Sequence, residues 1–165
     1  MLASLLILQL EKLVPTINAL LSSIFPTPNI EHLINGIGIM KIIEISIAIV
    51  KNRENLFLIC LRPDNVHQGG KWEFPGGKVK ENETPEQAML RELKEEVAIT
   101  AVDYRLLERM FFDYGDKQLN LSFFLINQFT GDAFANEGQL MRWVKKADLQ
   151  KYTFPDANAA VIAKL

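Results

Sequence analysis

The segment 84–97 most constrains the fold of this chain, because it carries the signals of an amphipathic helix from end to end. Thr84 is a natural N-cap, Pro85 takes the first helical position, and Gln87 completes a capping box with Thr84. At about 100° per residue, one arc of this helix collects apolar side chains, namely Met89, Leu90, Leu93 and Val97. The sequence therefore predicts a helix with one buried face.

Strand patterns surround this helix. Isoleucine alternates with small or polar residues over 43–49, and Leu56–Leu61 is a continuous apolar run typical of a strand buried on both faces. Phe74-Pro75-Gly76-Gly77 predicts a tight loop. We expect further strands at 106–112, 119–126 and 141–144, and a closing helix at 157–165. The mixture predicts an α/β fold, and the lack of a βαβ series argues against a doubly wound nucleotide-binding fold.

Size and composition exclude several classes of protein. The chain has 165 residues, of which 48% are hydrophobic and 23% charged, so it has room for one ordinary globular domain. A net charge of −2 argues against a surface that coats a nucleic acid polymer, since such surfaces need clustered positive charge. A single cysteine, Cys60, excludes an internal disulfide framework and a cysteine-based zinc cluster.

A second arc of the same helix is acidic. Glu92, Glu95 and Glu96 have the i, i+3, i+4 spacing that places side chains on neighbouring turns of one face. One interpretation is a solvated acidic face, with Arg91 and Lys94 as partial partners. The other is a site for a hard divalent cation such as Mg²⁺, which binds carboxylate oxygens and phosphates together. The spacing alone leaves both open.

The context of these carboxylates resembles a known family. The run GKVKENETPEQAMLRELKEEVAI, from Gly77 onward, resembles the Nudix box, with one departure, because Ala98 stands where the family has a glycine. If that position needs a left-handed backbone, alanine costs on the order of 1 kcal/mol. The matching positions are Gly77, Glu83, Arg91, Glu92, Leu93, Glu95, Glu96 and Ile99.

The resemblance extends beyond the box to a type within the family. The segments KWEFPGG, NEGQ and FPDANAAVIAKL are similar to the bacterial MutT type, and the likeness covers 40–165. It implies an α/β/α sandwich with a mixed β-sheet between helices. It also implies a monomeric, metal-dependent hydrolase of 8-oxo-dGTP that limits mutation by cleansing the nucleotide pool. Another substrate (a different nucleoside triphosphate, a dinucleoside polyphosphate or a nucleotide sugar) and a non-catalytic nucleotide-binding module are the alternatives.

The resemblance also implies roles for individual residues at a Mg²⁺ site, with Mn²⁺ as an alternative ion. Glu95 and Glu96 are expected to be metal ligands, and Glu92 a ligand, the general base, or both. Arg91 is expected to orient Glu92, and Glu83 to brace the junction between loop and helix. Two further ligands are expected from elsewhere, the backbone carbonyl of Gly76 and the carboxylate of Glu137.

Five residues are expected, by the same resemblance, to bind the nucleotide. Asn158 would read the oxidised guanine, because an amide offers both an acceptor and donors to its changed edge. Phe74 and Tyr114 would wall the base pocket, Arg62 would lie near the sugar and phosphates, and Lys117 would contact the nucleotide. The plainer interpretations are a helix-start residue for Asn158, core packing for the aromatics and surface charge for the two cations.

The first 39 residues differ from the rest, since Glu11, Lys12 and Glu31 are the only charged residues among them. They could be a docking helix, a weak membrane-surface anchor, or upstream sequence if translation begins at Met40. We favour the third interpretation, because Met40 falls where a protein of the MutT type would begin. The extension lacks both an apolar run of membrane-spanning length and the basic start of a signal peptide, so we expect a cytoplasmic protein without a membrane partner.

Overall fold

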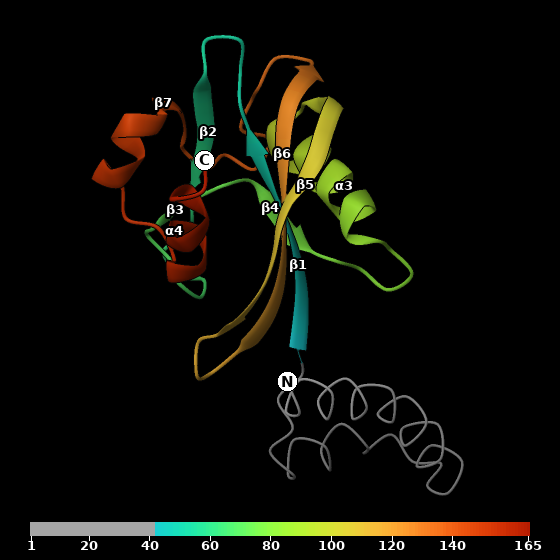
Figure 1. Cartoon of the computed structure of the whole chain (residues 1–165), viewed down its shortest axis with the longest axis vertical. Helices are drawn as coiled ribbons and strands as arrows, with labels where there is room; N and C mark the ends of the chain where they lie inside the picture. The colour runs from blue at the N-terminus through green and yellow to red at the C-terminus, as the bar shows by residue number, and fades with distance from the viewer. Residues whose placement is uncertain (1–41) are drawn as a thin grey trace, which may run out of the picture. The chain divides into compact units, whose positions relative to one another are not determined.

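A computed structural model describes residues 42–165, so the expectations for the extension lie outside the described part. The strands are β1 (Ile42–Val50), β2 (Leu56–Leu61), β3 (Trp72–Glu73), β4 (Gly76–Lys78), β5 (Thr100–Asp113), β6 (Gln118–Thr130) and β7 (Met141–Lys145). The helices are α3 (Pro85–Val97), the 3₁₀ helix η1 (Lys146–Lys151) and α4 (Asp156–Ile162) (Figure 1).

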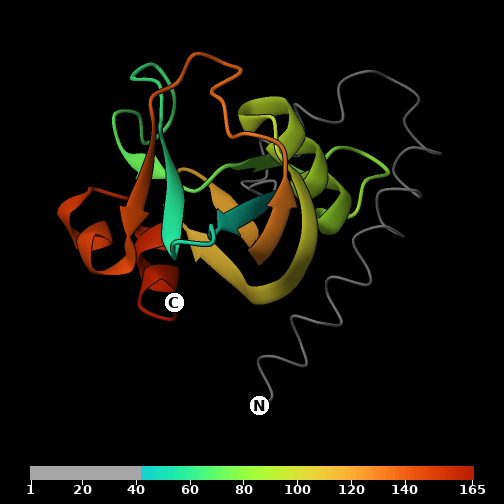
Figure 2. The same cartoon turned by 90° about the horizontal axis from the view of Figure 1, so that it is seen from above.

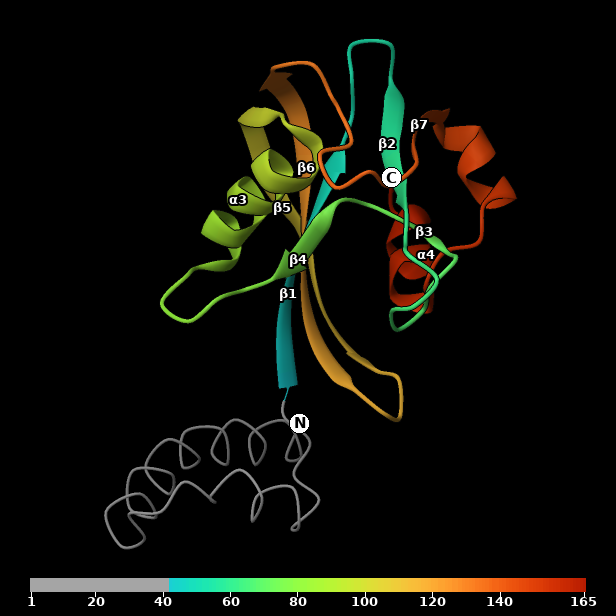
Figure 3. The same ribbon diagram turned by 180° about the vertical axis from the view of Figure 1, so that it is seen from behind.

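Within residues 42–165 the strands form two sheets, in the orders β4-β1-β6-β5 and β3-β2-β7. Strand β1 pairs parallel with β6 from Ile42↔Gln118 to Val50↔Ile126, and antiparallel with β4 on its other side. The first sheet is therefore mixed, as expected. Seen from behind, β4 crosses in front of β1, and the chain then runs on into α3 (Figure 3).

Two apolar clusters lie on opposite sides of the first sheet, because successive residues of a strand point to opposite faces. Ile47 and Ile49 belong to the cluster that includes Ala157 and Val161 of α4. Ala48 and Val50 belong to the other, which holds the apolar face of α3, namely Met89, Leu93 and Val97. Figure 2 shows α3 and α4 on the two sides of the sheet. This arrangement confirms the predicted α/β fold with a mixed sheet between helices.

The predicted helix is confirmed in detail. Thr84 is the N-cap of α3, and its side chain and that of Gln87 form the capping box reciprocally. Ala98 caps the other end in the left-handed region, with φ 61° and ψ 13°. This position therefore does need a left-handed backbone, and the cost expected for an alanine in that conformation applies.

Some boundaries differ from those predicted. Strand β5 begins at Thr100, six residues before the expected start at Leu106. Bulges between Ala101 and Glu108 interrupt the alternation of side chains in this part, so the sequence pattern did not indicate a strand there. The predicted FPGG loop is partly strand, since Gly76 and Gly77 pair with Ile47 and Ser46 of β1. The short strand β3 and the helix η1 carry too few residues for a periodic signal and were not predicted. In the part of the chain described, no helix has the length and apolar character to cross a membrane.

Candidate active site

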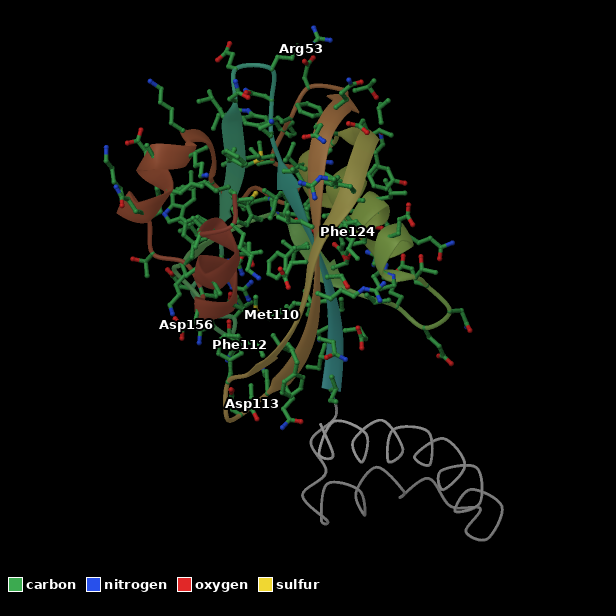
Figure 4. The ribbon with its side chains drawn as sticks, in the orientation of Figure 1. Arg53, Met110, Phe112, Asp113, Phe124 and Asp156 are labelled. Carbon is green, nitrogen blue, oxygen red and sulfur yellow. The ribbon has the colours of Figure 1, made fainter. Side chains whose placement is uncertain are left out.

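A cavity of about 460 Å³ lies beside α4 and the first sheet. Strand β1 contributes three isoleucines, at 43, 45 and 47, β4 contributes its glycines, and the turn between β5 and β6 contributes Tyr114 and Lys117. Met110 and Phe112 of β5 pack against the same cluster as α4, which begins at Asp156 (Figure 4). The cavity brings together eight residues expected at the site: Arg62, Phe74, Gly76, Glu96, Tyr114, Lys117, Glu137 and Asn158. The other four, Glu83, Arg91, Glu92 and Glu95, do not line it and are joined by hydrogen bonds at α3.

Arg91 is the centre of that hydrogen-bond network. Its Nε and Nη2 donate to the two carboxylate oxygens of Glu83, at 2.7 and 2.8 Å. Its Nη1 donates to Glu92 Oε1 at 2.6 Å and to Glu95 Oε2 at 2.9 Å, and Nη2 also donates to the carbonyl of Lys78 at 3.0 Å. The bidentate pair explains why hydrogen bonding to Arg91 lowers the pKa of Glu83 to about 2. One guanidinium therefore ties the loop after β4 to two carboxylates of the acidic face.

The glycine pair of β4 permits a close approach of backbone to carboxylate. A Cβ atom at Gly77 would collide with the carboxylate of Glu92, and one at Gly76 would collide with the backbone of Ser46. The N–H of Gly76 donates to Glu96 Oε2 at 2.9 Å. Strand β4 and the acidic face of α3 are thus in direct contact.

Glu96 is in an unusual environment for an acid. Burial, followed by the carboxylates of Glu73, Glu92 and Glu137, raises its pKa to about 8, against the lowering effect of the Gly76 N–H. The carboxylates of Glu73, Glu92 and Glu137 are thus close enough to Glu96 to act on its ionisation. Glu96 and Glu137 also line a second cavity of about 320 Å³, together with Glu73 and Cys60.

The donor set fits a hard divalent cation, although among residues 42–165 no three acidic, histidine or cysteine side chains are already grouped as ligands. The oxygens are instead held by other partners, Glu92 and Glu95 by Arg91, and Glu96 by Gly76. Carboxylate and carbonyl oxygens are the ligands that Mg²⁺ prefers. A cation beside Glu96 would also favour the ionised form that its surroundings now disfavour. The residues that would hold the ion are Glu92, Glu95, Glu96, Glu137 and the carbonyl of Gly76.

Asn158 lines the cavity from α4 and is the buried polar residue there. It is 6% exposed, and its Oδ1 atom is buried without a hydrogen-bond partner in the part of the chain that the structure describes. Asn158 is not an N-cap, since Pro155 holds that position at α4 and no side chain caps the helix there. A buried acceptor without a donor costs about 1–3 kcal/mol, so a ligand or a water molecule that donates to this oxygen would be stabilised here.

The two aromatic residues differ in exposure. Phe74 is 1% exposed and packs on Phe154 with 5.6 Å between ring centroids, so it is a core residue that also lines the cavity. Tyr114 is half-buried, and its hydroxyl accepts a hydrogen bond from the N–H of Ala157 at 3.4 Å. His67 meets the Tyr114 ring edge-on at 5.3 Å, so the loop after β2 touches the turn between β5 and β6 at the cavity.

Arg62 is held in place by partners on its own side of the cavity. Its Nη2 and Nε donate to the carbonyl of His67, at 2.7 and 3.2 Å, and its Nη1 pairs with Glu73. Sequence reasoning missed Glu73, a mostly buried acid whose pKa is raised by burial despite Arg62. The available signal was a charged residue directly before the apolar Phe74-Pro75 pair. Lys117 lines the cavity from the turn between β5 and β6.

Comparison with known proteins places the chain in a family. A family model described as a NUDIX domain matches residues 46–164. The chain is 40% identical to the 8-oxo-dGTP diphosphatase of Escherichia coli (strain K12) over 126 residues, which cover 76% of this chain and 98% of that protein. It is 31% identical to the CTP pyrophosphohydrolase of the same strain over 123 residues, 74% of this chain and 90% of that protein.

Solved structures agree with this assignment. A structure of MutT, from work on Aliivibrio salmonicida and Vibrio cholerae, superposes with a TM-score of 0.68 at 42% identity, covering 75% of this chain and 96% of that one. The resemblance of the 77–99 segment to the Nudix box is thereby confirmed. Because the domain model spans most of the chain and the relatives match over nearly their whole length, this protein belongs to the Nudix family.

Proposed function

We propose that this protein hydrolyses 8-oxo-dGTP to 8-oxo-dGMP and pyrophosphate, using Mg²⁺ or, alternatively, Mn²⁺. The relatives at 40% identity that bear the name 8-oxo-dGTP diphosphatase support this proposal, since this chain covers 98% and 92% of two of them. In the cell the reaction would remove oxidised guanine from the cytoplasmic nucleotide pool before replication uses it. The proposed working unit is a monomer that needs no nucleic acid polymer and no membrane.

The observation that carries the proposed substrate is the unpartnered Oδ1 of Asn158 in a residue lining the cavity. Unmodified guanine presents two acceptors, N7 and O6, on the edge that an amide would read. Oxidation at C8 turns N7 into a donor, which matches the free acceptor, while the amide N–H can donate to O6. Ordinary guanine would leave the Asn158 oxygen facing another acceptor, and a site of this kind rejects such an analogue strongly.

The α3 carboxylates supply the reaction centre of the proposal. Glu92, Glu95, Glu96, Glu137 and the Gly76 carbonyl would hold the cation, which would supply neutralisation of phosphate charge and orientation of water. Arg91, through its 2.6 Å hydrogen bond, keeps the Glu92 carboxylate in one orientation. Glu83 in turn holds the other edge of the same guanidinium. Arg62 and Lys117 are proposed to contact the sugar–phosphate end of the nucleotide, and Phe74 and Tyr114 to flank the base.

The proposed chemistry is an attack by water on the β-phosphorus. The new bond joins the water oxygen to that phosphorus, and the bond from the phosphorus to the α–β bridging oxygen breaks. The monophosphate leaves with the bridging oxygen, and the other product is pyrophosphate. Glu92 accepts the proton released by the water, which general-base catalysis requires within hydrogen-bond reach.

The test is a panel of nucleotides with detection of pyrophosphate, at concentrations below saturation so that rates report kcat/KM. The proposal expects 8-oxo-dGTP to be turned over far faster than dGTP, in a reaction that stops when a chelator removes the cation. Equal rates on the two guanine nucleotides would refute the proposed substrate.

A second candidate substrate is CTP, because a CTP pyrophosphohydrolase is among the relatives and cytosine offers an N4 amino donor that the Asn158 oxygen could accept. The same panel separates the two. Preference for CTP over 8-oxo-dGTP would favour this candidate and retain the same cation chemistry.

A further inference from the structure

The carboxyl end of α3 is closed by a distant loop. The last four carbonyl groups of a helix have no partner inside it, and in α3 they belong to residues 94–97. Asn136 Nδ2 donates to the carbonyls of Lys94 and Glu95, at 3.3 and 3.1 Å. The backbone N–H groups of Asn136 and Phe134 donate to those of Glu96 and Val97, at 3.0 and 3.1 Å. The loop between β6 and β7 therefore satisfies this helix end by itself.

Gln139 adds a hydrogen bond that the helix end does not need. Its Nε2 donates to the carbonyl of Glu96 at 3.1 Å, although the N–H of Asn136 already serves that carbonyl. Its Oε1 accepts the backbone N–H of Glu137 at 3.2 Å. One amide side chain thus connects Glu96 to Glu137, and both of these residues line the same two cavities.

Glu137 needs such a support. It is exposed, and it precedes Gly138, whose φ is +74°. Without a tie, the conformational freedom of an exposed loop would favour positions that take Glu137 away from α3. We infer, on the basis of the proposed cation role of Glu137, that Gln139 is a positioning residue that holds Glu137 next to Glu96 before the cation binds.

The test is to measure Mn²⁺ binding to the nucleotide-free protein by electron paramagnetic resonance. Gln139→Met keeps the length of the side chain and removes both hydrogen bonds. Residues that orient metal ligands typically change metal affinity by about 10–100-fold, so we expect Q139M to bind Mn²⁺ about tenfold more weakly. In turnover assays we expect kcat to fall and the KM for nucleotide to stay within about twofold, since no nucleotide contact is lost.

Asn136→Ala is the matched control, because it removes two donors from the same helix end and leaves the Glu137 N–H bonded. It should lower the Tm and leave Mn²⁺ affinity within about twofold of wild type. In a Glu137→Gln background, Q139M should have no further effect on Mn²⁺ binding, as a double-mutant cycle requires of a residue acting through Glu137.

The inference would be overturned by wild-type Mn²⁺ affinity in Q139M, by an equal loss in N136A, or by an undiminished effect of Q139M in the E137Q background. Wild-type Mn²⁺ affinity in E137Q itself would also overturn it, even with 8-oxo-dGTP hydrolysis intact. Conversely, a failed nucleotide panel leaves the metal-binding result readable. If Q139M does not fold, amide exchange of wild-type Glu137 decides, since slow exchange supports the tie and exchange at the rate of an open loop refutes it.

Discussion

Single residues at this site work by sharing partners. Arg91 divides its donors among Glu83, Glu92, Glu95 and the Lys78 carbonyl, so the acidic face of α3 is held without a cation. Two of the α3 carboxylates have different surroundings in the structure. Glu95 is half-exposed beside Arg91, as the plain interpretation has it, whereas Glu96 is turned into the protein against Gly76.

At the residue scale, Asn158 sets the first prediction. Asn158→Ala removes the acceptor and the donor proposed to read the oxidised base, so kcat/KM for 8-oxo-dGTP should fall about 100-fold, the equivalent of two hydrogen bonds. The value for dGTP should change less than about threefold, because that base never satisfied the amide. Steady-state rates on both nucleotides measure this. Asn120→Ala, which lies outside the cavity, is the control. An equal loss on both nucleotides would contradict the reading role of Asn158.

Glu96 sets the second prediction, which concerns pH. A folded-state pKa of about 8, raised from 4.5, means that the native protein binds a proton that the unfolded chain has lost. Stability from this group is therefore present below pH 4.5 and is lost as pH rises through about 8. Denaturant unfolding of the chelator-treated protein at a series of pH values measures it. Glu96→Gln keeps an acceptor for the Gly76 N–H and should reduce the loss of unfolding free energy between pH 4.5 and about 8. Parallel curves for the two proteins would show that Glu96 titrates normally.

At the scale of elements, α3 illustrates how two ends of one helix are specified differently. Its N-terminus is closed locally by Thr84 and Gln87, three residues apart. Its C-terminus lacks the usual glycine and relies on Asn136 and on the loop around it. The only local feature of a C-cap in this part of the described chain is the left-handed backbone of Ala98.

Ala98 sets the third prediction. Ala98→Gly should stabilise the protein by about 1 kcal/mol, because glycine adopts φ 61° without the Cβ penalty. Ala159→Gly is the control, an exposed alanine in α4 where glycine should cost about 1 kcal/mol. Urea unfolding midpoints of the two variants should shift in opposite directions. Destabilisation by both would mean that Ala98 is not strained.

At the scale of the whole molecule, the two apolar clusters on either face of the first sheet place the site. Among the described residues, the two clusters hold side chains from Ile45 to Leu165, and residues 41–165 form one compact unit. The cavity and the acidic face arise from the same elements.

This distribution of the core sets the fourth prediction, that a chain beginning at Met40 is the functional unit. A domain with its own core folds alone, so the shortened protein should keep its Tm and a kcat/KM within about twofold of the full chain. Thermal unfolding and the nucleotide assay compare the two. Aggregation or loss of turnover in the shortened protein would mean that residues 1–39 contribute to folding or to the site.

Local patterns in the sequence determined what depends on neighbours along the chain. The capping box, the apolar face of α3 and the strands β1, β2 and β7 follow from side chains a few residues apart, and their boundaries were predicted within one residue. The Nudix motif likewise lies in one continuous segment, which is why the family could be identified. The predicted range of strand β5 was too short, because its bulges break the two-residue period on which such predictions rest.

Only the tertiary structure decided which distant residues meet. Glu73 pairs with Arg62, 11 residues away, and Gln139 bonds to Glu96, 43 residues away. The burial of the Asn158 oxygen likewise depends on separate elements packing together. The raised pKa of Glu96 has the same origin, since burial and three carboxylates from different parts of the chain produce it. Periodicity reports which face of an element is apolar, whereas desolvation and charge depend on what packs against that face once the two sheets and both helices have come together.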